Sequence, residues 1–191
     1  MSGCVSAAMV VLPAGSATAA MHECITGRPT AASYTWNFRQ EANNIFDDVQ
    51  LNALQARYHA EQLQSFEFHP YLSWQSYADQ LTQVKSAVND MGDLLCRLET
   101  IRRVVAPWQQ RTIDRIATAV RLMADNTQDA IWYGRSNQQT LWSSLTYQKY
   151  VNNIYNEAQS LTQSVGNAVE YGKVGPQYQE LKKDIGMKAS S

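Results

Sequence analysis

The sequence predicts an all-α fold: an antiparallel up-down four-helix bundle of long helices, preceded by an irregular N-terminal leader. Apolar residues recur in alternating steps of three and four from residue 38 onward, which is typical of helices with one apolar side. The breaks in this pattern are short and contain Pro or Gly, so consecutive helices should lie antiparallel. No helix can bury its apolar side alone, and four such sides together make one core.

Size and composition fit one globular domain without a strong electrostatic field. The chain has 191 residues, of which 45% are hydrophobic and 17% charged, with a formal net charge of -1. This length is sufficient for one buried core. A nearly neutral chain has no overall field that would capture nucleic acid or an anionic membrane, so we expect no nucleic-acid partner.

Residues 1–20 have the features of a truncated signal peptide. A short apolar core at residues 7–12 is followed by Ala17-Thr18-Ala19, which fits the small-residue pattern of a signal-peptidase site. The basic segment that normally precedes the core is missing, and a start codon assigned too far downstream would explain its loss. We therefore expect a periplasmic or secreted protein. The alternative is a cytoplasmic protein with an Ala-rich N-terminal tail.

Two cysteines remain after such a cleavage. Cys24 belongs to an irregular leader at residues 21–32, and Cys96 lies near the end of the second predicted helix. In an oxidising compartment such a pair often forms a disulfide, and the segment that follows Cys24 is long enough to reach Cys96. Closing this loop of about 70 residues would stabilise the fold by roughly 4 kcal/mol. The alternative is two separate thiols, with Cys96 as a small core residue.

The bundle is predicted to occupy residues 33–172. Its first helix should begin near Ser33 or Thr35, which are both suitable N-caps, and end before His69-Pro70. Asn52 and His59 fall on its apolar side, so they are candidate buried polar residues that fix helix register, or else partly exposed residues. The alternative is a ligand-binding role, or for His59 a role as a pH sensor. The apolar residues of this side are Phe38, Ala42, Ile45, Val49, Ala56, Leu63 and Phe66.

The second and third helices are predicted to meet at Pro107. Ser73 is the predicted N-cap of the second helix. Pro107 is the predicted first residue of the third, where its missing N–H costs nothing, and the alternative is one long helix kinked at this proline. The apolar residues of the second helix are Tyr77, Leu81, Val84, Val88, Met91, Leu95 and Leu98. Those of the third are Ile113, Ile116, Val120, Met123, Ala130 and Ile131.

The fourth helix should follow a short turn. Gly134 is the predicted end of the third helix, and Ser136 to Gln139 fits a capping box that opens the fourth. We expect the fourth helix to end near Gly172 and residues 173–191 to form a C-terminal tail, in which Tyr178, Leu181 and Ile185 could form a short helix. The apolar residues of the fourth helix are Leu141, Leu145, Val151, Ile154, Ala158, Leu161, Val165 and Ala168.

Tryptophans mark the ends of the predicted helices. In an up-down bundle Trp36 and Trp108 share one end, and Trp74, Trp132 and Trp142 share the other. We interpret these side chains as plugs at the ends of the bundle, with an aromatic ligand cage as the alternative.

The sequence contains no recognisable catalytic or metal-binding motif. None of its three histidines, His22, His59 and His69, has Glu three residues before it, as the di-iron sites of helical bundles require. Serine-hydrolase, zinc-protease and phosphate-loop motifs are absent. We therefore predict a non-enzymatic protein without cofactor or metal. No helix after the leader is apolar on all sides, so we predict no transmembrane segment in the mature chain and disfavour a membrane-active bundle.

Arginines concentrate around the predicted turn at Pro107. At helix ends they would complement helix dipoles, and Glu99 with Arg103 makes a favourable pair one turn apart. The alternative is a binding patch for an anion such as a phosphate, a lipid headgroup or an acidic glycan. The candidate residues of this patch are Arg97, Arg102, Arg103, Arg111 and Arg115.

Several short stretches carry a resemblance to known sequences. Ser-Tyr-Thr-Trp-Asn-Phe at 33–38, Leu-Glu-Thr-Ile-Arg-Arg at 98–103, Leu-Met-Ala-Asp-Asn-Thr at 122–127 and Tyr-Gln-Lys-Tyr-Val at 147–151 resemble those of an uncharacterised family of exported bacterial all-helical proteins. That family has no assigned function, so the resemblance implies only export. We predict a non-enzymatic binding or structural helical module exported to the cell envelope, with an unknown protein partner or self-association. The alternative is a ligand-binding sensor bundle that uses its core or its arginine-rich end.

Overall fold

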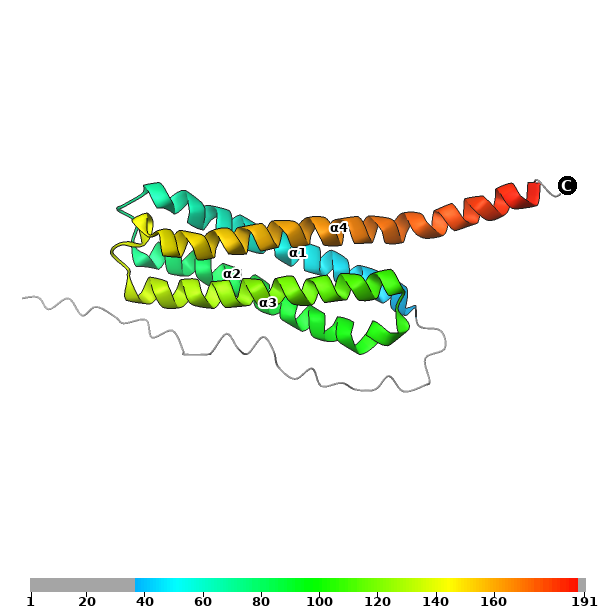
Figure 1. Cartoon of the computed structure of the whole chain (residues 1–191), viewed down its shortest axis with the longest axis horizontal. Coiled ribbons are helices and arrows are strands. Elements are labelled where there is room, and N and C mark those ends of the chain that lie inside the picture. Colours follow the sequence, from blue (N-terminus) through cyan, green and yellow to red (C-terminus); the bar gives the residue numbers. More distant parts are fainter. Residues whose placement is uncertain (1–36, 189–191) are drawn as a thin grey trace, which may run out of the picture.

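The computed structural model describes residues 37–188, which form four long α-helices and three short 3₁₀ turns without a strand (Figure 1). The predicted signal peptide at 1–20 and leader at 21–32 lie outside these residues. The helices are α1 (Phe38–Ser65), α2 (Trp74–Ile101), α3 (Pro107–Ser136) and α4 (Leu145–Lys188), and the turns are η2 (Phe66–Phe68), η3 (Arg102–Val104) and η4 (Leu141–Ser143).

The four helices form the predicted antiparallel up-down bundle. Along the chain each helix packs against the next, and α4 closes the bundle by packing against α1 (Figure 1). The core consists of aliphatic, alanine, methionine and aromatic side chains from all four helices. The fold class predicted by the spacing of apolar residues is therefore confirmed.

Helix α1 begins later than predicted. Its N-cap is Asn37, whose side chain accepts a hydrogen bond from the backbone N–H of Gln40 at 3.2 Å. Ser33 and Thr35, the predicted caps, lie outside the described residues. Because the Asn37 side chain satisfies an amide of the first turn that has no partner within the helix, it is sufficient to start α1.

The buried side of α1 differs from the prediction at two positions. Ala53 and Ala60 are fully buried, whereas their neighbours Asn52 and His59 are only half-buried. Asn52 and His59 are thus not the buried polar residues that the sequence predicted. The small alanines occupy the seam because they allow α1 to approach α2 and α4 closely, and the larger polar side chains lie beside it.

The predictions for α2 and the start of α3 hold. Ser73 occupies the N-cap position of α2, although its side chain makes no capping hydrogen bond, and Pro107 is the first residue of α3. The chain therefore reverses at Pro107 instead of continuing as one kinked helix. All predicted apolar residues of these two helices are buried except Leu95 and Ile131, which are partly buried against the core.

The connection between α3 and α4 was predicted incorrectly. Helix α3 runs through Gly134 to Ser136, because Gly134 serves close packing: a Cβ atom at this position would lie 2.5 Å from the Trp74 ring. The segment from Ser136 to Gln139 opens no helix. Instead α4 begins at Leu145, where the Ser144 Oγ accepts a hydrogen bond from the Tyr147 backbone N–H. Leu145 is exposed, not buried as predicted.

Helix α4 is also longer than predicted, since it continues past Gly172 and Pro176 to Lys188. Its last turns project beyond the other three helices as a single helical arm (Figure 1). Gly172 again serves close packing, because a Cβ atom there would lie 3.0 Å from both Asn43 Nδ2 and the Trp108 ring. The predicted division into a bundle at 33–172 and a tail at 173–191 therefore falls inside one helix.

Candidate functional site

The two ends of the bundle differ in charge. The end at which α1 begins, α2 ends and α3 begins carries the five candidate arginines and is called the charged end below. At the opposite end, residues 68–78 and 136–148 contain no Asp, Glu, Lys or Arg, although 17% of the whole chain is charged. This second region, formed by the α1–α2 and α3–α4 connections, is called the uncharged end.

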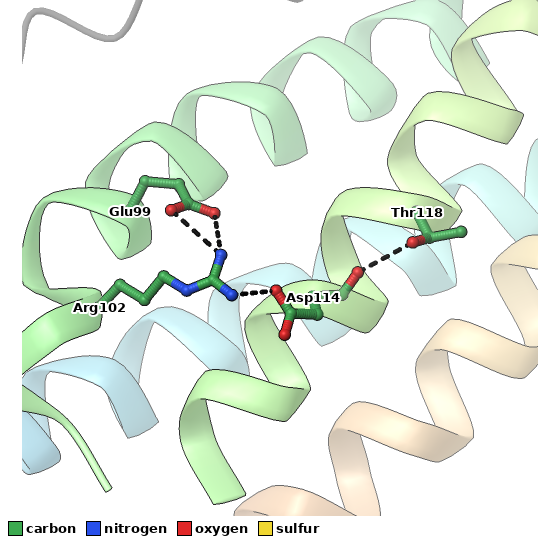
Figure 2. A network of polar contacts seen from close by, with 4 residues as sticks. All are labelled: Glu99, Arg102, Asp114 and Thr118. Atoms are coloured by element: carbon green, nitrogen blue, oxygen red, sulfur yellow. Dashed lines mark hydrogen bonds and ion pairs between the residues drawn. The ribbon is translucent and has the colours of Figure 1, made fainter. Parts of the chain in front are cut away.

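At the charged end Arg102 has two carboxylate partners. Its Nη1 lies 3.2 Å from Glu99 Oε1, and its Nη2 contacts Asp114 Oδ1 (Figure 2). The Thr118 hydroxyl donates to the backbone carbonyl of Asp114 at 3.0 Å, one turn further along α3. Arg102 thereby joins the end of α2 to the start of α3, and its charge is largely offset by these two partners.

The other arginines of the candidate patch are exposed. Arg103 lies in η3, and Arg111 and Arg115 lie on the first turns of α3, on either side of Asp114. Arg97 lines an open cleft of about 400 Å³ between α1 and α2, together with two carboxylates and several amides. Since acidic residues alternate with the arginines here, anion binding at this end stays a prediction. The residues lining the cleft are Asn37, Gln40, Glu41, Asn44, Ile45, Asp48 and Arg97.

The sequence analysis missed the buried polar residue of the charged end, Gln109. Its side chain is fully buried, and its Oε1 accepts a hydrogen bond from the Ala106 backbone N–H at 3.0 Å. Its Nε2 donates to the Arg39 carbonyl and to Asn43 Oδ1, both at 2.9 Å. A glutamine two residues after the helix-initiating Pro107 fits a capping box, so the hydrogen bond with the Ala106 N–H could have been predicted from the sequence. The contacts of Gln109 with α1 could not.

Of the two candidate disulfide cysteines the structure describes one. Cys96 is half-buried on α2, three residues before Glu99 of the Arg102 ion-pair network. Cys24 lies outside the described residues, so the Cys24–Cys96 disulfide stays a prediction.

The two polar candidates on α1 have local partners. Asn52 donates to the Asp48 carbonyl, one turn earlier on the same helix, at 3.0 Å. His59 Nδ1 lies 2.8 Å from Gln80 Oε1 on α2, and its ring meets Tyr58 edge to face. The contact of His59 with Gln80 joins α1 to α2, which supports a role in helix pairing, whereas the contact of Asn52 lies within α1.

The uncharged end exposes large apolar side chains. Tyr71 in the α1–α2 connection is 99% exposed, Leu145 at the start of α4 is 80% exposed, and Trp132 in the last turn of α3 is 67% exposed. Trp142 in η4 is also exposed. Trp74 packs on Gly134, as the predicted role of a plug at the end of the bundle requires. Trp132 and Trp142 are exposed, so the prediction that they plug this end is wrong.

Beneath this surface lies a cluster of tyrosines. The Tyr77 ring meets Phe66 and Tyr147 edge to face at centroid distances of 5.2 and 5.8 Å, and the Tyr77 hydroxyl donates to the Phe66 carbonyl. The Tyr147 hydroxyl is buried without a hydrogen-bond partner. Burial raises the pKa of Tyr77, and burial together with the nearby Tyr77 raises the pKa of Tyr147 well above its ordinary value. The hydroxyls of Tyr77 and Tyr147 therefore keep their protons to a higher pH than exposed tyrosines do.

Neither a metal site nor a membrane-spanning helix is present among the described residues. Within residues 37–188, no three His, Cys, Asp or Glu side chains converge where they could hold a metal ion. None of the described helices is both long and apolar enough to cross a membrane.

Comparisons with known proteins do not assign a role to either end. No family model, no curated protein and no solved structure matches this chain. This agrees with the resemblance to a family without an assigned function.

Proposed function

We propose that this protein is a non-enzymatic binding and structural module of the cell envelope, which docks through its uncharged end. The observation that supports this proposal is the exposure of Tyr71, Trp132 and Leu145 at an end whose two connecting segments, 68–78 and 136–148, contain no charged residue. Soluble monomers rarely expose several large apolar side chains in one region unless that region makes contacts. Tryptophan and tyrosine are also the side chains that contribute most to binding free energy when an interface covers them.

The packing of the uncharged end suits a contact surface. The Phe66, Tyr77 and Tyr147 rings and the contact between Trp74 and Gly134 hold both connections in place from below. A surface held rigid in this way loses little conformational entropy when a partner binds. The long helices then serve to hold this surface apart from the opposite end of the molecule.

Export to the periplasm or the outside belongs to the same proposal, on the support of the signal-like residues 1–20 and the cysteine pair. Intact mass of the protein recovered from the envelope fraction tests both features. We expect a mature N-terminus after residue 19 and a mass lower by two hydrogen atoms under non-reducing conditions, from a Cys24–Cys96 disulfide. A retained leader together with three alkylatable thiols, from Cys4, Cys24 and Cys96, would contradict both.

Docking is tested by cross-linking in envelope extracts. We expect the wild-type chain to form a defined adduct that is lost when Tyr71, Trp132 and Leu145 are all replaced by Ser. Replacement of Leu51, Leu54 and Tyr58, which are exposed on the side of α1, is the matched control and should leave the adduct intact. Equal adducts from both triple variants would contradict docking through the uncharged end.

A ligand-binding sensor is the second candidate, and the cleft beside Arg97 supports it. With Arg97 on one side and Glu41 and Asp48 on the other, the cleft suits a small zwitterionic molecule. A thermal-shift screen with amino acids and amino sugars tests this function. The control is Arg121→Ala, which removes an exposed arginine from α3, away from the cleft. A thermal shift that disappears in Arg97→Ala but persists in Arg121→Ala would favour the sensor over the docking module.

A further inference from the structure

We infer that the uncharged end lies in the interfacial layer of a lipid bilayer, with Tyr71, Trp132 and Leu145 among the headgroups and upper acyl chains. The inference rests on the proposed function, because it names the partner of the surface through which the module docks. It concerns a protein that lies on a membrane, which is compatible with described helices that are unable to cross one.

The first argument is the arrangement of the exposed side chains. Trp132 is exposed between the buried Ala130 and Gly134, so it points outward from α3, and Leu145 points outward from α4 in the same way, because Tyr147 is buried. Tyr71 extends from the α1–α2 connection, which contacts the α3–α4 connection through η2 and η4. The three exposed side chains thus come from three separate elements at the same end of the bundle, as contact with a planar boundary across the helix axes requires.

The second argument is composition. The uncharged segments are bounded by Glu67 and Asp79 on one side of the bundle and by Arg135 and Lys149 on the other. Between these limits the two segments contain one histidine, His69, and no Asp, Glu, Lys or Arg. The remaining residues are aromatic, aliphatic, amide and hydroxyl side chains, together with one proline. Tryptophan and tyrosine are enriched where lipid meets water, and charged side chains are costly below the headgroups, so this composition suits the interface.

Trp132 and Leu145 lie close enough to the end of the bundle to enter the interfacial layer together. Trp132 lies four residues before the end of α3, which corresponds to a rise of about 6 Å, and Leu145 is the first residue of α4. Interfacial proteins bury their apolar surface to a depth of roughly 5–10 Å. Both connections lie at the same end of the bundle, opposite the projecting arm of α4 (Figure 1). Immersion to the level of Trp132 would therefore cover the three exposed side chains. The exposed Arg135 lies at a similar depth, where its long side chain can extend the guanidinium to the headgroups.

The lipid class follows from the charges nearby. Arg135 and Lys149 are the only Arg or Lys side chains at the borders of the uncharged segments, whereas the five candidate arginines lie at the opposite end. Burial of apolar and aromatic surface, not attraction to anionic headgroups, therefore drives binding. Neutral phosphatidylcholine vesicles should bind the protein about as well as vesicles that contain phosphatidylglycerol, and added salt should have little effect.

Vesicle sedimentation with the full chain tests the inference. We expect binding to phosphatidylcholine vesicles, and a loss of affinity of roughly tenfold or more in the triple variant Tyr71→Ser, Trp132→Ser, Leu145→Ser. The control triple variant Leu51→Ser, Leu54→Ser, Tyr58→Ser removes comparable exposed side chains from the side of α1 and should bind like wild type. Quenching of wild-type tryptophan fluorescence by brominated phosphatidylcholine supplies a measurement that needs no variant, and we expect it to be strong.

Three results would overturn the inference: wild-type protein that stays in the supernatant, equal binding by both triple variants, or binding that needs anionic lipid and is lost in high salt. Self-association without vesicles that only the uncharged-end variant abolishes would overturn it too, in favour of a second copy as the partner. If vesicle binding fails but the cross-linked adduct still depends on the uncharged end, the lipid inference falls and the proposed docking function stands. If neither responds, both fall.

Discussion

At the charged end, directed polar contacts between helices accompany the packing of Trp108 on Phe46 and Tyr171. Gln109 hydrogen-bonds across to α1, and Arg102 joins α2 to α3 through two carboxylates. At the uncharged end, the contacts are those of rings and of glycine, with Trp74 packed on Gly134 and Tyr77 between Phe66 and Tyr147. Arg103, Arg111 and Arg115 are exposed at the charged end, whereas Tyr71, Trp132 and Leu145 are exposed at the uncharged end. The two ends of the same bundle therefore present surfaces of different chemistry.

The largest effect on stability should come from Gln109→Leu at the charged end. This change leaves the Ala106 N–H, the Arg39 carbonyl and Asn43 Oδ1 without their buried partner, so we expect a loss of about 2–4 kcal/mol in the free energy of unfolding. Urea unfolding followed by circular dichroism measures it. Gln110→Leu removes one partly buried hydrogen bond and is the control, with a smaller expected loss. Equal losses would show that the buried network has no special weight at this end.

Gly134→Leu should have the next largest effect, at the uncharged end. A Cβ atom alone would lie 2.5 Å from the Trp74 ring, so Trp74 must move and the cluster must repack. We expect a loss of about 1–3 kcal/mol, even though leucine favours helix more than glycine does. Ser136→Leu, at an exposed position two residues later, should change stability little in the same unfolding experiment. A Gly134 variant as stable as wild type would mean that ring packing does not position the uncharged end.

Alkaline pH should weaken the uncharged end selectively. Tyr77 and Tyr147 have raised pKa values in the folded state, so above the ordinary tyrosine value of 10.0 the unfolded chain releases protons that the folded chain keeps. Stability present below this pH is thus lost as pH rises, by up to about 1.4 kcal/mol per pH unit for Tyr147, which has the larger upward shift, and by less for Tyr77. Urea midpoints measured between about pH 9 and pH 11 follow this loss.

The matching variant is Tyr147→Phe. We expect it to make the alkaline loss smaller and to leave stability at neutral pH unchanged or slightly higher, because the Tyr147 hydroxyl has no partner among the described residues. Tyr58→Phe, at an exposed position on α1, should leave the pH profile as in wild type. An identical alkaline loss in all three proteins would refute the assignment to the buried cluster.

Arg102→Ala should have the smallest effect, although its ion pairs are the most visible feature of the charged end. Both partners are partly exposed, and exposed ion pairs contribute about 0–1 kcal/mol. We expect the difference from wild type to shrink further at about 1 M NaCl, where charges are strongly screened. Unfolding at low and high salt measures this. A loss as large as that of Gln109→Leu would mean that Arg102 is essential to the α2–α3 turn.

The course of the bundle could be predicted from the sequence because large aliphatic residues leave little doubt about the buried side of a helix. In α2 every predicted apolar position packs in or against the core. In α1 the buried side includes Ala53 and Ala60. Because alanine occurs both in cores and on surfaces, it gives little indication of the buried side of a helix, and the prediction placed the neighbouring Asn52 and His59 there instead.

Glycine was the main source of error in the predicted helix boundaries. Gly134 and Gly172 were expected to end helices, yet both lie inside helices and admit another side chain against the backbone. Sequence alone does not separate these two uses, since each depends on the absence of a side chain and only one depends on a distant partner such as Trp74 or Trp108. The sequence alone shows two separate segments without charged residues. Only the fold shows that these segments lie at the same end of the bundle.

The length of α4 has a mechanical consequence. A continuous helix of 44 residues rises about 65 Å, and the part after Gly172 alone rises about 24 Å. Because helices resist bending, a group attached near Lys188 would lie at a nearly constant distance from the opposite end of the bundle. A fluorophore placed there, paired with one on the α3–α4 connection, would report this distance by energy transfer.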